Sequence, residues 1–508
     1  MTGPAGRAGR AAVYNRYWTT GGGAEKYGGA VAEHLSRRGP VELLTHEPFD
    51  RDALAERLSL DLSGCTVREV PHASAAVTDA SRDVDLFVNV SHRSRDASAA
   101  ARSLYVVHFP TAFGSAEPAR ADGAVVEWGT GFHQPDGRVT WTDGRASLLV
   151  TTDPGRPVDL TLLLGFQRPA AAGPAEVRVV VDGAVVATTV LDRPRQLLER
   201  ATGRALRVRV ASPAPGVAAE VVLESGSFVP ADVVGGDDRR TLGVPLAAVS
   251  VGRSPLALLP GRALAPSTSM RWLDSYDAVV SNSAFTQEWV RRRWGADSAV
   301  LFPPVSLRSP APKERVVLSV GRFFPTGQGH SKKQLEMVAA FRALVDDGLR
   351  DWELHLVGGC SDGGRGYLAS VEAAASGYPV VLHVNASGTE LEELTSRASV
   401  YWHLAGLGED PERDPDRLEH FGISTVEAMS AGAVPVVLAA GGLVETVRDG
   451  VDGFHVRDVA ELVARTRDLT ADPVRLAGLS VSAAARARDF SVEAFGRRLD
   501  EVVDSLGR

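Results

Sequence analysis

The sequence predicts an α/β protein with two domains of parallel β-sheet and a β-sandwich inserted into the first of them. Three observations lead to this prediction. Short buried strands alternate with amphipathic helices in both halves of the chain, a pattern typical of parallel sheets. Between about 115 and 251 the helical period disappears and short alternating runs replace it. A glycine-rich turn, Gly21-Gly22-Gly23, follows the first strand, as in doubly wound sheets.

Residues 11–114 are expected to form the first part of the N-terminal domain. Strands are predicted at 11–14, 41–44, 85–90 and 104–107, with a helix between the first two. His108 directly follows the last of these strands, and the carboxyl end of a parallel strand is well placed for a ligand residue. A lone histidine is nevertheless more often structural.

Residues 115–251 are predicted to form the inserted β-sandwich. Asp182-Gly183 lies between two alternating runs and is typical of a two-residue hairpin turn. Four side chains could form a sugar-stacking surface, although such residues more often belong to the core of a sandwich: Trp128, Phe132, His133 and Trp141. We hypothesise that the insert binds or positions a saccharide acceptor, and an oligomer interface is the alternative.

The α/β pattern returns near residue 272. We assign 252–306 to the rest of the N-terminal domain and a linker, 307–490 to the C-terminal domain, and 491–508 to a helix that crosses back to the first domain. The predicted C-terminal strands are 316–320, 352–357, 380–384, 400–404 and 435–438.

Length and composition indicate a globular protein, with 508 residues of which 44% are apolar and 23% charged. The net charge of −8 argues against nucleic acid as the main partner. Two cysteines, Cys65 and Cys360, suggest neither a disulfide framework nor a zinc ribbon. Because no apolar run reaches the length of a membrane span, we expect a cytoplasmic protein, with peripheral membrane contact left open. The oligomeric state is not predicted.

The stretch 419–442 has the chemistry of a ligand site. Glu419 lies in a loop before a predicted short helix, Glu427 lies in its first turn, and Gly422 lies in a sharp turn between them. The free N–H groups of a helix N-terminus attract phosphate, whereas carboxylates accept hydrogen bonds from sugar hydroxyls. A nucleotide sugar carries both groups. Glu427 could instead form a capping box with Ser424, which needs no ligand.

Glu419 and Glu427 resemble the E-x7-E signature of the retaining glycosyltransferases of family 4. The strings Gly441-Gly442-Leu443-Val444-Glu445 and Asp449-Gly450 with Asp452-Gly453 fit the same family. The wording HFGIS after Glu419, and His108-Phe109-Pro110, is closest to GDP-mannose-dependent mannosyltransferases of lipid-linked oligosaccharides. The resemblance implies the GT-B fold, in which two Rossmann-like domains face each other across a cleft. The donor would bind mainly to the second domain and the acceptor to the first.

The resemblance also implies roles for single residues. Arg322 and Lys332, with Lys333 as the alternative lysine, would stabilise the charge of a departing diphosphate. Glu419 and His108 would hold the transferred sugar. Donor contacts are expected from Glu427, which would bind the ribose, and from Gly22, Gly23, Phe421, Gly422 and Ile423. Judged without the resemblance, Lys333 reads as a solvated surface lysine, whereas Arg322 is expected to be tucked at its strand end.

The implied reaction moves a sugar from a GDP- or UDP-linked donor to an acceptor hydroxyl, with retention of anomeric configuration. In this family the acceptor is thought to attack the face from which the diphosphate leaves, so neither a protein nucleophile nor a metal is required. The acceptor could be a saccharide, a lipid-linked saccharide or a small-molecule glycoside.

Other interpretations remain open. A metal-dependent transferase would need an Asp-x-Asp at a strand end, but Asp83-Val84-Asp85 precedes its strand and reads as a turn. A catalytically idle carbohydrate-binding scaffold and a sugar-nucleotide epimerase are the alternatives to a transferase. The acidic stretch 409–419 is expected to be a solvated loop, with binding of a cationic acceptor as the alternative.

Overall fold

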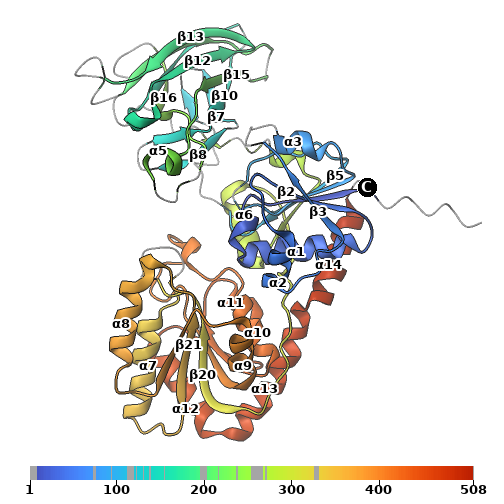
Figure 1. Cartoon of the computed structure of the whole chain (residues 1–508), viewed down its shortest axis with the longest axis vertical. Helices are drawn as coiled ribbons and strands as arrows, with labels where there is room; N and C mark the ends of the chain where they lie inside the picture. Colours follow the sequence, from blue (N-terminus) through green and yellow to red (C-terminus); the bar gives the residue numbers. More distant parts are fainter. Residues whose placement is uncertain are drawn as a thin grey trace, which may run out of the picture.

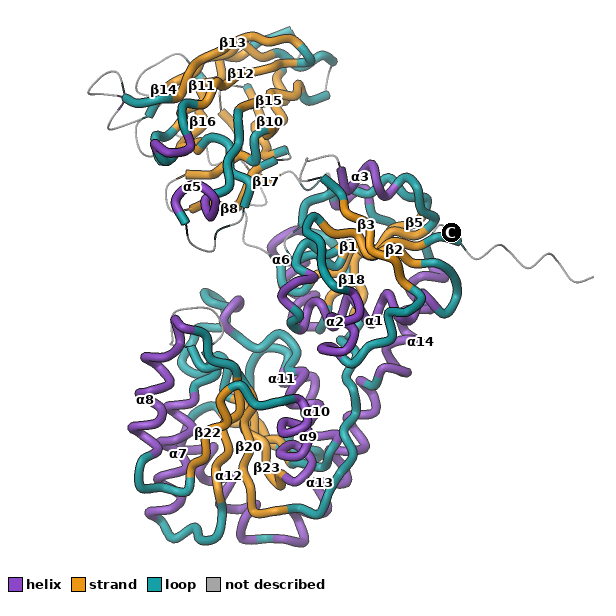
Figure 2. Tube along the Cα trace, in the orientation of Figure 1, coloured by secondary structure: helices purple, strands orange, loops and turns teal. Residues whose placement is uncertain are grey.

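A computed structural model gives the fold. It describes residues 9–506 apart from 72–75, 93, 111–118, 122, 130, 137–138, 154, 195–198, 200–202, 215–216, 236–237, 239, 253–266, 269, 271 and 325–330. Two α/β units and one β-rich unit are visible, and the last helix runs from the C-terminal unit back to the N-terminal one (Figures 1 and 2).

The N-terminal unit is built on a seven-stranded sheet in the order β19-β18-β5-β4-β1-β2-β3. All of its neighbouring strands pair in parallel. Its elements are β1 (Ala11–Tyr14), η1 (Trp18–Thr20), α1 (Gly23–Ser36), β2 (Val41–Thr45), α2 (Arg51–Leu58), β3 (Cys65–Glu69), α3 (Ala76–Ser81), β4 (Leu86–Asn89), β5 (Arg102–Val107), η4 (Leu273–Ser275), β18 (Ala278–Ser281), α6 (Ala284–Trp294) and β19 (Ala299–Val300).

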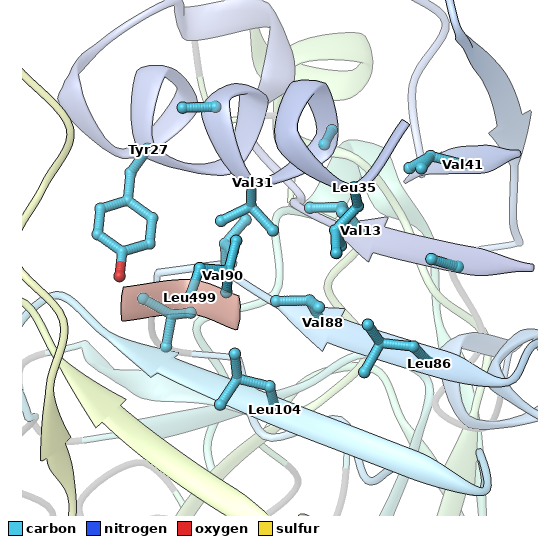
Figure 3. Close-up of a cluster of buried hydrophobic side chains, with 14 of the residues drawn as sticks. Val13, Tyr27, Val31, Leu35, Val41, Leu86, Val88, Val90, Leu104 and Leu499 are labelled. Atoms are coloured by element: carbon cyan, nitrogen blue, oxygen red, sulfur yellow. The ribbon is translucent and has the colours of Figure 1, made fainter. Parts of the chain in front are cut away.

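The core of this unit explains why α1 forms and where it lies. Tyr27, Val31 and Leu35 repeat at helical spacing and point from one face of α1 toward the sheet (Figure 3). There they meet strand residues such as Val13 and Leu104. The expected strands 11–14, 41–44, 85–90 and 104–107 are confirmed to within two residues at each end.

The β-rich unit lies between β5 and β18 in sequence. Its strands are β6 (Ala119–Ala121), β7 (Ala124–Trp128), β8 (Phe132–Asp136), β9 (Val139–Thr142), β10 (Arg145–Thr152), β11 (Val158–Leu164), β12 (Ala175–Val181), β13 (Ala184–Leu191), β14 (Arg204–Val210), β15 (Ala219–Ser225), β16 (Pro245–Val251) and β17 (Ser267–Thr268), with η2 (Ala170–Ala172) and α5 (Pro230–Val234). They form one sheet β13-β12-β15-β10-β7-β17 and another β14-β11-β16-β9-β8, with β6 beside β7.

The two β-sheets share one apolar core, to which residues such as Leu148 of β10 and Leu162 of β11 contribute. Asp182 and Gly183 join β12 to β13 as a hairpin, as predicted. Pairing of β17 with β7 carries the first sheet beyond residue 251, where we had placed the end of the insert. The other predicted boundary, at 114/115, lies outside the described residues.

The C-terminal unit has a six-stranded parallel sheet in the order β22-β21-β20-β23-β24-β25. Its elements are β20 (Glu314–Val320), α7 (Gln334–Asp346), β21 (Glu353–Gly358), η5 (Asp362–Gly364), α8 (Arg365–Ala375), β22 (Val380–Val384), α9 (Gly388–Arg397), β23 (Ala398–His403), η6 (Pro415–Arg417), α10 (Ile423–Ser430), β24 (Val434–Leu438), α11 (Leu443–Thr446), β25 (Phe454–Val456), α12 (Val459–Ala471), α13 (Pro473–Ala487), η7 (Arg488–Phe490) and α14 (Val492–Ser505).

The last helix, α14, joins the core of the N-terminal unit. Phe495, Leu499 and Val503 pack in the same cluster as Val31 of α1. The expected crossing helix is therefore confirmed. In the part of the chain that the structure describes, no helix is long and apolar enough to cross a membrane.

Candidate functional site

The glycine-rich turn after β1 is held by a buried carboxylate. Glu25 accepts hydrogen bonds from Asn15 Nδ2 (3.2 Å), Thr20 Oγ1 (2.7 Å) and Gly22 N (2.7 Å). Gly21 has φ +57°, a left-handed conformation that glycine adopts without strain. Since α1 begins directly after this turn, Glu25 fixes both the turn and the helix N-terminus.

Gly23 brings this turn against the opposite domain. A Cβ atom at Gly23 would lie 3.6 Å from Cδ1 of Ile423, at the start of α10. Two predicted donor-binding positions, one from each domain, therefore face each other. Phe421 is different, because its side chain is buried against Phe302 and Phe490, so only its backbone could serve a ligand.

The loop 419–422 depends on glycines at a second chain segment. Gly442 N donates to the carbonyl of Glu419 (2.8 Å), and a Cβ at Gly442 would overlap the carbonyl oxygen of His420. Gly422 has φ +91° and precedes α10 directly. The string Gly441-Gly442 is thus required for the close approach that shapes this loop.

The capping-box interpretation of Glu427 is wrong. The residue that caps α10 is Gly422, with no side-chain cap, and Ser424 instead accepts a hydrogen bond from the Tyr401 hydroxyl (2.8 Å). Glu427 is the fifth residue of the helix, so it lies in the second turn and not in the first. Its carboxylate is left available for other partners.

Glu419 lies in a compact charged cluster at the carboxyl end of β23. Its Oε2 accepts from Lys332 Nζ at 2.6 Å and lies 2.8 Å from His403 Nε2. The three side chains are only 20%, 19% and 2% exposed for Lys332, Glu419 and His403. The stem of Lys332 lies over Gly321, where any Cβ would overlap it.

This cluster keeps Glu419 ionised. Burial by itself raises the pKa of the Glu419 carboxyl, but the Lys332 ammonium and the His403 imidazole outweigh it and hold the pKa well below its ordinary value. A fixed anion beside a fixed cation can accept hydrogen bonds from hydroxyl groups while the cation serves a phosphate.

Glu427 faces cations from both domains. Its Oε1 lies 3.4 Å from Lys26 Nζ of α1 and 3.6 Å from Arg308 Nη2, and its side chain is 15% exposed. These distances are loose for ion pairs, which leaves the carboxylate able to rearrange around a ligand. Glu427 therefore lies at the contact between the N-terminal and C-terminal units.

Two predictions about basic residues need correction. Lys333 is not a solvated surface lysine, because its side chain is only 5% exposed and its amine lies 3.0 Å from Glu409. Lys333 pairs with Glu409, whereas Lys332 pairs with Glu419, so Lys332 is the lysine that faces the cluster. Arg322 does follow β20, but it is exposed and its guanidinium lies over the Phe324 ring at 5.6 Å. It is not tucked at the strand end.

His108 follows β5, as expected, and its ring is held in place. Its Nε2 lies 2.9 Å from the carbonyl oxygen of Val90, and its ring packs edge-on against Tyr27. Burial lowers the pKa of His108, so the imidazole is neutral at pH 7. Because a carbonyl only accepts, Nε2 carries the proton and Nδ1 is left as an acceptor.

Sequence reasoning missed three residues of this region: Glu25, Lys26 and His403. His403 ends a buried strand of the parallel sheet, and that position could have drawn attention to it. Glu25 and Lys26 are surface-like residues in the first turn of a helix. Only the fold shows that they meet the glycine-rich turn and Glu427.

The acidic stretch 409–419 is mostly ion-paired and not simply solvated. Glu409 bonds Lys333, Glu412 lies 2.9 Å from Arg292, and Asp416 lies 2.9 Å from Arg293. Asp83-Val84-Asp85 lies before β4, as the turn interpretation requires. Across the described residues, no group of three or more His, Cys, Asp or Glu side chains is arranged to hold a metal ion.

The four ring side chains that could form a sugar-stacking surface are packed within the insert, with Trp141 buried and the other three half-buried. Trp141 is 6% exposed and packs on Phe228, whereas Trp128 packs edge-on against Phe132. His133 Nε2 bonds the carbonyl of Thr241 (2.7 Å). These contacts favour the core interpretation over a sugar-stacking surface.

Parts of the chain are similar in sequence to known glycosyltransferases. Residues 308–488 match the family model described as glycosyl transferases group 1. The chain is 31% identical over 248 residues to a D-inositol 3-phosphate glycosyltransferase of Geodermatophilus obscurus, covering 45% of this chain and 51% of that one. It is 28% identical over 269 residues to a GDP-Man:Man(3)GlcNAc(2)-PP-Dol alpha-1,2-mannosyltransferase of Neurospora crassa, covering 45% of each. The chain spans about half or less of the length of these curated relatives.

Solved structures resemble this fold at low sequence identity. Anabaena Alr3699/HepE in complex with UDP-glucose is 13% identical with a TM-score of 0.52, covering 98% of this chain and 100% of that one. A glycosyltransferase from Rickettsia africae is 11% identical with a TM-score of 0.52, covering 97% of each chain. Residues 308–488 therefore resemble the glycosyl transferases group 1 family, in a chain that has the GT-B fold.

Proposed function

We propose that this protein is a retaining glycosyltransferase that moves a sugar from a nucleoside diphosphate sugar to an acceptor hydroxyl. The observation that carries the proposal is the Lys332–Glu419–His403 cluster, which places an ionised carboxylate and a cation at one sheet edge. Glu427, nearby in sequence, lies at the contact between the two α/β units. A sugar diphosphate needs both a carboxylate, which accepts hydrogen bonds from its hydroxyls, and a cation, which binds its phosphates.

In this proposal each residue has a distinct task. Glu419 accepts hydrogen bonds from hydroxyls of the transferred sugar, and Glu427 from the ribose. An ammonium has three donors, so Lys332 can keep its bond to Glu419 and still bond a phosphate oxygen. The exposed Arg322 is able to move onto the diphosphate and stabilise its charge as the glycosidic bond breaks.

Neutral His108 offers an acceptor for a sugar hydroxyl from the opposite domain. The acceptor attacks the face from which the diphosphate departs, and a phosphate oxygen takes the hydroxyl proton. Contact between the domains excludes water, so that transfer outruns hydrolysis. We further propose that no metal is required and that the reaction is cytoplasmic, since the free cysteines Cys65 and Cys360 suit a reducing compartment.

The donor is found by incubating the protein with UDP-, GDP-, ADP- and dTDP-sugars in EDTA and following free nucleoside diphosphate. We expect slow release from one donor, because water can replace the missing acceptor. Glu427→Ala should weaken donor binding, and Arg322→Ala should lower turnover while binding changes little. Wild-type kinetics in both variants would refute these assignments, and activity only after Mg²⁺ is added would refute metal independence.

A further inference from the structure

Helix α6 of the N-terminal domain contacts the C-terminal domain at both of its ends. Its N-terminal residues Ala284 and Phe285 donate their backbone N–H groups to the carboxylate of Glu445, each at 2.7 Å. Ser283 accepts from Thr286 N (3.0 Å). Two of the N–H groups that a helix leaves unpaired at its start are thus capped by a carboxylate from the other domain.

The other end of α6 is held by two ion pairs. Arg292 bonds both carboxylate oxygens of Glu412 (3.2 and 2.9 Å), and Arg293 bonds both oxygens of Asp416 (3.0 and 2.9 Å). Arg293 also donates to the carbonyl of Pro110 (2.6 Å) and lies over the Phe109 ring. The Arg293–Asp416 pair joins two nitrogens to two oxygens, and bidentate pairs of this kind fix geometry better than single contacts.

A ring stack lies between these contacts and the candidate sugar site. Phe109 and His420 are nearly parallel, with a 9° interplanar angle and centroids 4.1 Å apart. Phe109 directly follows His108, and His420 directly follows Glu419. The stack therefore sets the spacing between the two side chains that we expect to hold the sugar from opposite domains.

We propose that these contacts form a closure latch that positions His108 against Glu419. The latch consists of the Glu445 cap on α6, the Arg292–Glu412 and Arg293–Asp416 pairs, and the Phe109–His420 stack. All of its contacts join the two domains, so opening the cleft breaks them together. Its residues are positioning residues: they do not touch the reacting atoms, and they act by holding those that do.

The latch gives a role to two segments that do not themselves contact the sugar: the acidic loop 409–419 and the string Gly441–Glu445. The loop carries Glu412 and Asp416 to α6, and the glycine pair that shapes the Glu419 loop leads directly into Glu445. One chain segment thus shapes the sugar-binding loop and grips the opposite domain. The consequence for transfer rests on the proposed function, whereas the latch itself does not.

The first test measures the distance between domains. Spin labels are placed at Arg82→Cys in the N-terminal domain and Val474→Cys in the C-terminal domain, both exposed, in a Cys360→Ser background. The parent should give one narrow distance distribution. Glu445→Gln and Arg293→Met should each add a longer component. Gln replaces one of the two accepting oxygens of Glu445 by an NH2 donor and removes its charge, and a thioether cannot pair with Asp416.

Matched controls separate the latch from general surface charge. Glu461→Gln removes a carboxylate that accepts from Arg457 N within one domain, and Arg467→Met breaks the pair with Asp347 within that domain. Both controls should keep the parent distribution. An unchanged distribution in Glu445→Gln and Arg293→Met, with folding intact by circular dichroism, would overturn the latch whatever the protein catalyses.

A second test reads the positioning role. Phe109→Leu and His420→Leu each place an apolar side chain at the contact but remove one of the two stacked rings. We expect kcat to fall by about 100-fold, the order reported for misplacing reacting groups by 1 Å, with donor affinity little changed. The share of donor lost to hydrolysis should rise. Loss of donor affinity with unchanged kcat in these variants would contradict the positioning role of the stack. A wild-type protein that releases nucleoside diphosphate from no donor would contradict the proposed function, but the distance measurement would still test the latch.

Discussion

Replacing Lys332 by Met tests the charged cluster most sharply, because its neighbour Lys333 supplies a matched control. Lys333 is buried and Lys332 is half-buried, and both pair with a glutamate within 3.0 Å. Only Lys332 faces Glu419. If Lys332 stabilises the departing diphosphate, the two substitutions must affect different properties of the protein.

For Lys332→Met we expect kcat to fall about 10²- to 10³-fold, which is about 2.7–4 kcal/mol of transition-state stabilisation lost with one positioned donor. Its effect on stability should be modest, since His403 remains 2.8 Å from Glu419. For Lys333→Met we expect a stability loss of about 1–3 kcal/mol, below the ~3–5 kcal/mol of a fully orphaned buried charge. The loss is limited because Glu409 keeps Arg417 at 3.0 Å.

The assay combines release of nucleoside diphosphate under saturating donor with a thermal melt of each variant. Met fits both positions by length, and at Lys333 it inherits the same φ of +60°, so backbone strain does not differ from that of lysine. The reasoning is refuted if Lys333→Met abolishes turnover in a stable protein, or if Lys332→Met turns over like the wild type.

Three further predictions follow from other contacts. Gly442→Ala should cost about 1–3 kcal/mol by overpacking against the His420 carbonyl, and calorimetry should show weaker donor binding because the Glu419 loop must shift. The stability that Glu419 contributes is present above its unfolded pKa of about 4.5 and is lost as pH falls through its lower folded pKa, so a pH–rate profile should show no loss of activity above about pH 5 from protonation of Glu419. Burial lowers the pKa of Lys313 from 10.5 to about 8, so the unfolded state binds more protons between these values and stability should rise with pH across that window. Melts at pH 7.5 and 10 should show this rise in the wild type and not in Lys313→Met.

Much of the fold follows from sequence patterns because burial imposes them. Val31 and Leu35 repeat at helical spacing since one face of α1 covers the sheet. Asp182-Gly183 specifies its hairpin through local backbone preference. The end of the insert was harder to predict, because β17 is a two-residue strand whose pairing with β7 comes from a distant part of the chain.

The candidate site was only partly predictable for the same reason. Glu419 and Lys332 were named from motif wording, yet their direct contact depends on how β23 and α7 meet in space. The prediction for Lys333 was wrong because two adjacent lysines look alike in the sequence, which does not indicate which of them is buried. Glu445 attracted notice as part of a string, but its partner is a helix start 160 residues earlier, which no local pattern indicates.

Hydrogen–deuterium exchange with and without UDP or GDP tests the central claim most directly, because it reports binding at each segment and needs no acceptor. We predict that one nucleotide slows exchange in the backbone around Glu419–Glu427 and Ser331–Lys333, and that Glu427→Ala loses this protection. Protection confined to the β-rich insert, or none with either nucleotide at saturating concentration, would contradict the assignment of the donor site to this cluster.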